Sequence, residues 1–292
     1  MARGRFLHTV VFIVTIAIAT CILPIGVQGS SKEKVIYSFT NGDDGYIPYS
    51  PLVMDGVGNL YGEANGGIGG YGVVFKLEPG STGYWTETTY YAFGDGGIHG
   101  ASPVGGLLMN PAGTFYGITT GGGSDNSGTV FELPAASLTN PSIYNFVRAG
   151  STQGLARDKT GNVYGTTSQG GTSGTGTVFE LALTDSGWNY EVIYNFGQTD
   201  GTDGIYPAGR LVTDDAGNLY GTTLEGGVYG AGTVFELVNT PNGWTESLLY
   251  NFTGGDNGST PIAGVIFDGK GNLYGTTPVS YTHLRAHETG RN

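Results

Sequence analysis

Short runs of β-branched and aromatic residues alternate with glycine-rich turns along most of the chain, and the same runs recur about every fifty residues. The clearest copy reads Gly-Asn-Leu-Tyr-Gly-Thr-Thr at 217–223 and Gly-Thr-Val-Phe-Glu-Leu at 232–237. Close copies lie at 161–181 and 271–277, and looser ones at 58–77 and 113–133. One supersecondary unit is therefore repeated.

Each unit contains four short polar-bounded runs that predict four antiparallel strands. The first strand begins near a proline, which has no N–H for a central ladder. It ends at an Asx residue followed within three residues by glycine, which is hairpin-turn chemistry. The second and third strands are the two runs quoted above, and the fourth begins at a tryptophan and closes on Tyr-x-Phe. The marker residues are Pro48, Pro103, Pro207 and Pro261; Asp55, Asn110, Asp158, Asp214 and Asp268; and Trp85, Trp188 and Trp244.

This unit predicts an all-β protein, a β-propeller of about five four-stranded antiparallel blades, or more in the intact gene, incomplete at the C-terminus. A single sheet so rich in Val, Tyr and Phe on both faces would be insoluble, whereas stacking the blades covers both faces. Residues 35–39 resemble the closing Tyr-x-Phe strand, so we expect an orphan fourth strand there.

The ends of the chain differ from the repeats. Residues 1–29 carry Arg3, Arg5, an apolar run and a small-residue site, which predicts a cleaved signal peptide and an extracytoplasmic, secreted or cell-surface protein. A retained membrane anchor is the alternative. Residues 30–278 form the expected repeat domain. Residues 279–292 depart from the repeat and resemble a translated sequencing adapter, so we expect a non-native tail and a truncated last blade.

Composition narrows the chemistry. Glycine accounts for 55 of 292 residues, but 19 Tyr and 13 Phe with no Gly-X-Y period exclude collagen and disorder. The only cysteine, Cys21, lies in the predicted signal, so no disulfide is expected. A net charge of −12 repels phosphate backbones and excludes nucleic acid as a partner.

The runs at 217–223 and 232–237, together with Leu-Tyr-Asn-Phe at 249–252, resemble the GloVer tandem repeat of "choice-of-anchor" bacterial surface proteins. The resemblance covers about residues 35–278 and implies an exported protein; it implies no catalytic residues. The Asp-x-x-Gly-Asn strand pair is also distantly similar to the blades of NHL and related propellers.

Antiparallel blades bring two sets of loops to one face: those joining strand four to the next strand one, and those joining strands two and three. We expect ligand contacts there from Asp44, Asp95, His99, Asp203, Tyr206, Tyr229 and Asp256. The pairs Asp43 and Asp44, and Asp200 and Asp203, offer oxygens suited to Ca²⁺. Asp-Gly is also ordinary turn chemistry, so no cofactor is expected.

Catalytic candidates are residues that depart from the repeat. Glu63 replaces the threonine found at 166, 222 and 276, and Glu225 lies in a loop beside Tyr229. Two acids across a central channel could cleave a glycosidic bond; the alternative is drift on solvated loops. We therefore predict a binding or interaction module for polysaccharide, envelope components or protein, with a carbohydrate-acting hydrolase or lyase, or a structural array, as alternatives.

Overall fold

The computed structural model describes residues 10–12, 33–94, 96–134, 142–146, 154–200, 202–278 and 284–285. Four four-stranded antiparallel sheets follow one another along the chain, each with its strands in sequential order. We call them blades 1 to 4. Blade 1 contains β2 (Val53–Met54), β3 (Leu60–Ala64), β4 (Val73–Pro79) and β5 (Trp85–Ala92). Blade 2 contains β6 (Ala101–Met109), β7 (Phe115–Gly121), β8 (Thr129–Leu133) and β9 (Ser142–Asn145).

The remaining strands complete the series. Blade 3 contains β10 (Ala156–Arg157), β11 (Val163–Thr167), β12 (Thr177–Thr184) and β13 (Gly187–Asn195). Blade 4 contains β14 (Ile205–Thr213), β15 (Leu219–Glu225), β16 (Thr233–Thr240) and β17 (Gly243–Asn251). After the short 3-10 helix η1 (Gly255–Asn257), the pair β18 (Ile266–Phe267) and β19 (Leu273–Gly275) begins a fifth blade.

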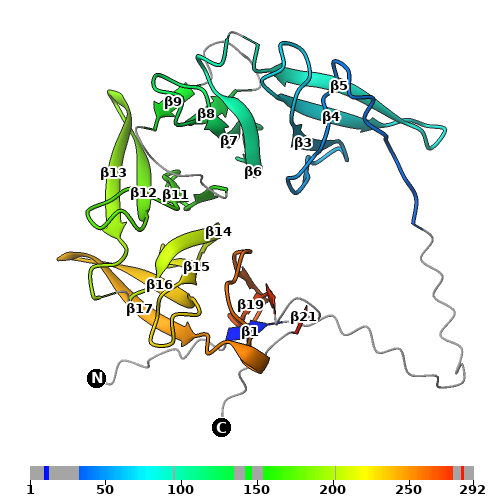
Figure 1. Ribbon diagram of the computed structural model, residues 1–292. Coiled ribbons are helices and arrows are strands. Elements are labelled where there is room, and N and C mark those ends of the chain that lie inside the picture. Colours follow the sequence, from blue (N-terminus) through cyan, green and yellow to red (C-terminus); the bar gives the residue numbers. More distant parts are fainter. Residues whose placement is uncertain are drawn as a thin grey trace, which may run out of the picture.

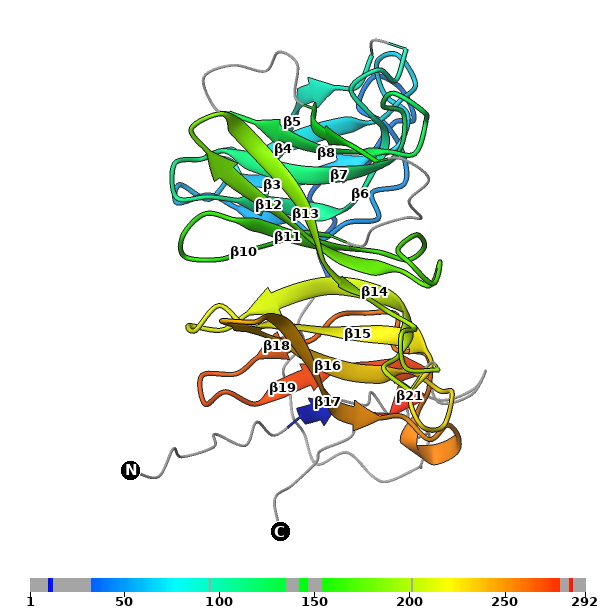
Figure 2. The same cartoon turned by 90° about the vertical axis from the view of Figure 1, so that its left-hand side faces the viewer.

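The blades are arranged around a central space (Figure 1). β6 and β14 lie on its inner side, and β5, β13 and β17 lie on the outside. In the view turned by 90°, blades 3 and 4 stack face to face (Figure 2). The repeated units therefore form a β-propeller, as the pattern of four strands per unit predicts.

Each first hairpin is held by its Asx residue. In blade 4, Asp214 Oδ1 accepts hydrogen bonds from the backbone N–H groups of Ala216 and Asn218, at 2.9 and 2.8 Å. Its other oxygen accepts from the Asn218 side chain and lies 3.1 Å from the Tyr220 hydroxyl. The same arrangement recurs at Asp55 and Asp268. This explains why Asp, Gly, Asn and Tyr recur together.

The glycine of Tyr-Gly-Thr-Thr makes room for the phenylalanine of Val-Phe-Glu-Leu. Gly221 pairs with Phe235 across β15 and β16, and a Cβ on Gly221 would lie 2.6 Å from the Phe235 ring. Gly165 and Phe179 repeat this in blade 3. The two repeated runs are therefore two halves of one packing unit.

Aromatic side chains of successive blades cover one another. Phe196, which follows β13, packs edge-on against Phe235 in blade 4, with ring centroids 5.1 Å apart. Phe93 packs in the same way against Phe131. Trp188 and Trp244 lie against tyrosines of the preceding blade, Tyr116 and Tyr164. Stacking thus removes both sheet faces from water, as expected.

Two features differ from expectation or extend it. Residues 35–39 form no strand, although Ile36, Tyr37 and Phe39 pack against the core of blade 1. The expected orphan strand is therefore wrong: its apolar side chains find a core, but no described strand offers it a hydrogen-bonding edge. β1 (Val10–Phe12) pairs in parallel with β19, on the edge that the third strand takes in complete blades.

The expected signal peptide otherwise lies outside the described residues, as does most of the expected tail apart from β20 (Thr277–Pro278) pairing with β21 (Leu284–Arg285). Among the described residues, no helix has the length and apolar character needed to cross a bilayer.

Candidate functional site

Loops from neighbouring segments meet at one end of the stacked blades. Tyr46 pairs with Asn65 in an isolated antiparallel bridge, and Gly123 donates a 2.8 Å hydrogen bond to Gly97 across blades. We call this end the loop face. Within the described residues it comprises 41–48, 65–72, 96–100, 121–128, 168–176, 197–200, 202–204, 226–232 and 253–260. The structure therefore brings together the two loop sets expected to share a face.

A repeated contact joins consecutive blades at the loop face. Tyr206 N–H donates to Thr175 O at 2.8 Å, and the next residue, Pro207, packs on Gly176, where a Cβ would lie 2.5 Å from the proline Cδ. Thr260 and Pro261 make the same contact with Ala231 and Gly232, and Ser102 and Pro103 with Tyr71 and Gly72. The pre-proline residues have positive φ, including 56° at Tyr206. Such strained backbone persists only where its surroundings impose it.

Asp44 is a structural anchor of its loop. It is buried, and it accepts hydrogen bonds from the Tyr37 hydroxyl, from N–H and Oγ1 of Thr40, and from Gly42 N–H. Burial acts to raise the pKa of Asp44, but these hydrogen bonds, those from Thr40 first, outweigh it and lower the pKa to about 2. Its oxygens are thus engaged within the loop.

Asp203 lies in a buried cluster at the boundary between blades 3 and 4. The Tyr194 hydroxyl lies 3.3 Å from Asp203 Oδ2 and 3.0 Å from Glu246 Oε2. Asp203 Oδ1 and Glu246 Oε1 are buried without a hydrogen-bond partner. Burial, aided by the charge of Asp203, outweighs the hydrogen bond from Tyr194 and raises the pKa of Glu246 to about 8. The Tyr194 hydroxyl of blade 3 thus contacts Glu246 of blade 4.

The other expected site residues are dispersed. Asp43 and Asp200 are exposed, Asp256 is exposed in η1, Tyr206 is half-buried, and Asp95 lies outside the described residues. His99 is half-buried, and its backbone oxygen accepts a hydrogen bond from Thr129. The described residues contain no cluster of three His, Cys, Asp or Glu side chains suited to a metal ion. Tyr229, in contrast, is exposed on the loop face.

Glu63 and Glu225 occupy different environments. Glu225 is exposed at the end of β15 in blade 4, as expected for a loop carboxylate. Glu63 is buried within β3 of blade 1, so its expected place on a solvated loop is wrong. Residues 61–64 of β3 are all buried, because blade 2 packs against the face of β3 that is turned toward it. The structure therefore gives these two acids no shared environment.

Glu63 meets the next blade directly. Its Oε2 accepts a 3.0 Å hydrogen bond from Gly106 N–H, and its Oε1 has no partner. Ser50 Oγ lies close enough to lower the pKa of Glu63, but its geometry falls short of a hydrogen bond. Burial dominates and raises the pKa to about 8. Burial therefore favours the protonated form of Glu63.

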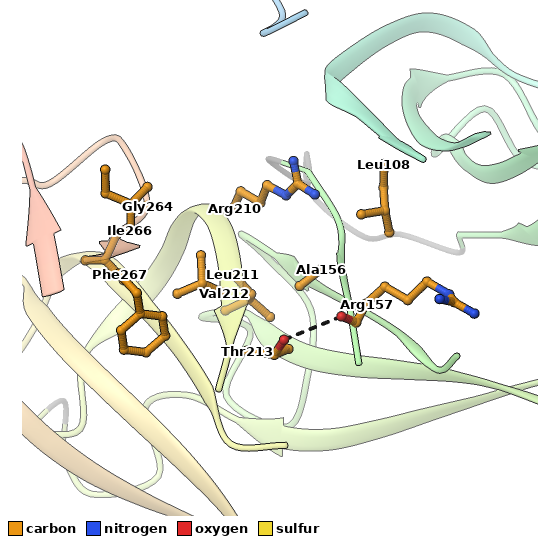
Figure 3. Close-up of a pocket in the computed structure, with 11 residues that line it drawn as sticks. Leu108, Ala156, Arg157, Arg210, Leu211, Val212, Thr213, Gly264, Ile266 and Phe267 are labelled. Carbon is orange, nitrogen blue, oxygen red and sulfur yellow. Dashed lines mark hydrogen bonds between the residues drawn. The ribbon is translucent and has the colours of Figure 1, made fainter. Parts of the chain in front are cut away.

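Two adjoining cavities follow the central axis. The larger, about 670 Å³, opens between the inner segments of blades 1, 2 and 4 and the partial fifth blade; the smaller holds about 480 Å³. Arg210 lines both. In Figure 3 its guanidinium points away from Leu211 and Phe267, which line the smaller cavity. This channel is of a size that binds small molecules.

The position of Arg210 is unique among the repeats. The residue three places after the marker proline, or after Ser151 in the third copy, is Pro51, Gly106, Gly154, Arg210 or Gly264. Inner strands approach closely here: a Cβ on Gly264 would lie 2.1 Å from Arg210 O. Sequence analysis missed Arg210, although a comparison of the five copies at this position would have found it.

The repeated unit matches a known protein family. The Gloeobacter/Verrucomicrobia repeat matches residues 21–154 and 144–286, so the chain belongs to this family, which confirms the resemblance to the GloVer repeat. No curated protein matches the sequence.

Similar solved structures include three enzymes. They are a luciferin-regenerating enzyme (15% identity, 82% of this chain and 76% of that chain, TM-score 0.51), a gluconolactonase from Xanthomonas campestris (12%, 75% and 65%, 0.46) and an endo-arabinase from Bacteroides thetaiotaomicron (14%, 82% and 93%, 0.44). The chain thus spans 65% of the length of that gluconolactonase. At these identities the likeness concerns the fold alone.

Proposed function

We propose that this protein is an exported binding module whose loop face recognises extracellular polysaccharide. The proposal takes residues 1–29 as a cleaved signal peptide, on which export rests. It takes residues 279–292 as a non-native tail. The observation that carries the proposal is a set of exposed aromatic and aliphatic side chains at the loop face. They are Tyr46, Ile47, Ile68, Tyr71, Ile98, Val228 and Tyr229.

These side chains are not required by the fold. Tyr71 and Tyr229 are 37% and 62% exposed, and the matching loops of blades 2 and 3 carry only glycine and polar residues. Structural roles recur in every copy, whereas a ligand contact is needed only once. An exposed tyrosine ring offers an apolar face for sugar C–H groups and a hydroxyl for hydrogen bonding. This combination favours a neutral saccharide over an anionic lipid or nucleic acid, given the net charge of −12.

The repeated aromatic residues have a different role. Trp188 packs on Tyr116, and its Nε1–H donates to Glu132 Oε2 at 3.3 Å across the boundary between blades. Such residues cannot stack on a sugar without opening the propeller. The binding surface therefore consists of the loop residues alone.

A glycan array tests the proposal. The chain without residues 1–29 and 279–292 should bind a polysaccharide, and the double variant Tyr71→Ala/Tyr229→Ala should lose at least tenfold in affinity for it. Tyr84→Ala is the matched control, since Tyr84 is 80% exposed in the β4–β5 turn at the opposite end. Equal loss in the control, or binding to protein or lipid spots instead of glycans, would refute the proposal.

A carbohydrate-acting enzyme is the second candidate. Glu63 favours it, because a buried acid whose pKa is about 8 could donate a proton beside the channel. Glycoside hydrolysis needs a second carboxyl group facing the first, and none of the described residues lining the two channel cavities is acidic. Release of reducing ends from polysaccharide by the wild type, absent in Glu63→Gln, would favour the enzyme.

A further inference from the structure

Arg210 carries a positive charge that no described residue pairs. None of the described residues accepts a hydrogen bond or ion pair from its guanidinium, and burial alone lowers its pKa. A half-buried guanidinium normally has an acceptor, because its five N–H donors lose water on burial. The structure therefore leaves an anion-binding group facing the channel.

The surroundings of Arg210 leave room for a ligand. The equivalent residues of the other copies are glycine or proline, so Arg210 carries the only long side chain at this repeat position. The larger cavity, toward the loop face, has apolar walls that include Val104 and Ile262. It also carries the hydroxyl-bearing residues Tyr49, Ser50, Thr276 and Thr277. Ser50 Oγ is buried without a partner, and Tyr49 is 73% exposed.

These groups define the chemistry of the ligand. A guanidinium forms paired hydrogen bonds with a carboxylate, and the hydroxyl groups of Ser50, Thr276 and Thr277 suit a hydroxylated body. The net charge of −12 disfavours a doubly charged phosphate more than a singly charged carboxylate. We propose that the channel binds a small sugar acid, whose carboxylate pairs with Arg210 and whose hydroxyl groups contact the Ser50 side of the cavity. This site is separate from the loop-face surface and does not depend on it.

Calorimetric titration at low ionic strength provides the test, with glucuronate, glucose and inorganic phosphate as probes. We expect the wild type to bind glucuronate, with glucose and phosphate at least tenfold weaker. Arg210→Gln should weaken glucuronate binding at least tenfold. Arg210→Lys, which keeps the charge but loses the paired geometry, should weaken it about threefold to tenfold.

Arg157→Gln is the matched control. Arg157 also lines the smaller cavity, but its guanidinium lies against Gly161 in the β10–β11 turn and points away from Arg210 (Figure 3). It should bind glucuronate as the wild type does. Thermal unfolding establishes that each variant is folded; if Arg210→Gln does not fold, Arg210→Lys decides. Absent glucuronate binding, equal loss in the control, unchanged binding in both folded Arg210 variants, or equal affinity for phosphate would overturn the proposal.

Discussion

Gly106 N–H donates a 3.0 Å hydrogen bond to Glu63 Oε2 across the boundary between blades 1 and 2. At the equivalent position of blade 4, Thr222 Oγ1 lies 3.1 Å from Ala263 O in the partial fifth blade. In blade 4 this position thus supplies a donor to a carbonyl, whereas Glu63 in blade 1 supplies an acceptor to an amide. A buried acid replaces a hydroxyl without breaking the contact between blades, and it adds a titrating group to the boundary between blades 1 and 2.

Glu63→Gln should change how stability depends on pH. In the wild type, burial raises the pKa of Glu63 from 4.5 to about 8. Between these values the folded state holds a proton that the unfolded chain releases, so the free energy of unfolding falls as pH rises and levels off above pH 8. Glutamine does not titrate. The free energy of unfolding of the variant should therefore rise relative to that of the wild type by up to about 1.4 kcal/mol per pH unit in this interval.

Urea unfolding at a series of pH values measures this difference. Glu225→Gln, at an exposed carboxylate, is the control and should run parallel to the wild type. A Glu63→Gln curve that is also parallel to the wild type would mean that Glu63 is ionised in the folded protein.

Gly176→Ala should destabilise the contact between blades 3 and 4. Its φ is +107°, and a Cβ would lie 2.5 Å from both Pro207 Cδ and the Thr167 backbone oxygen. Gly187 has the same φ of +107° but nothing within 4 Å of its Cβ position, so Gly187→Ala isolates the backbone cost. We expect Gly187→Ala to lower the free energy of unfolding by about 1 kcal/mol, and Gly176→Ala to lower it by about 1–3 kcal/mol more. Equal midpoints of thermal unfolding would show that neither Pro207 nor the Thr167 oxygen excludes a side chain at position 176.

Tyr220→Phe should weaken a hairpin from within. The Tyr220 hydroxyl lies 2.7 Å from Glu236 Oε1 and 3.1 Å from Asp214 Oδ2. The hydroxyl has one proton, which the two carboxyl groups share, so its removal takes away about one charge-assisted hydrogen bond and costs about 1.5–3 kcal/mol. Tyr84→Phe removes an exposed hydroxyl and should cost nothing measurable. Chemical denaturation of the two variants compares them directly, and similar losses would argue against the hairpin network.

The sequence predicts the architecture because structural roles recur. The other copies carry residues that match Asp214, Gly217 and Tyr220, and each has the same structural role there. Their spacing therefore reveals the hairpins and the four-stranded unit. Residues 35–39 show the limit: their composition is that of a strand, but strand formation also requires a free edge, which composition does not contain.

The candidate site is less predictable for the opposite reason. Glu63 and Arg210 each occur once, and their meaning depends on burial and on distance from the axis. An acid in place of threonine can be inferred from the sequence, but its enclosure by blade 2 cannot. The opposite case is Asp44, which the sequence suggests as a ligand contact. In the structure its carboxylate accepts four hydrogen bonds from residues close to it in the chain.

Hydrogen–deuterium exchange with and without the polysaccharide selected on the array tests the binding proposal most directly. The polysaccharide should slow amide exchange in the loop-face segments 65–72 and 226–232. Exchange in strands β5 and β13 should stay unchanged. Protection confined to the outer strands or to the β4–β5 turn around Tyr84, with both loop segments exchanging as in the free protein, would contradict a ligand surface at the loop face.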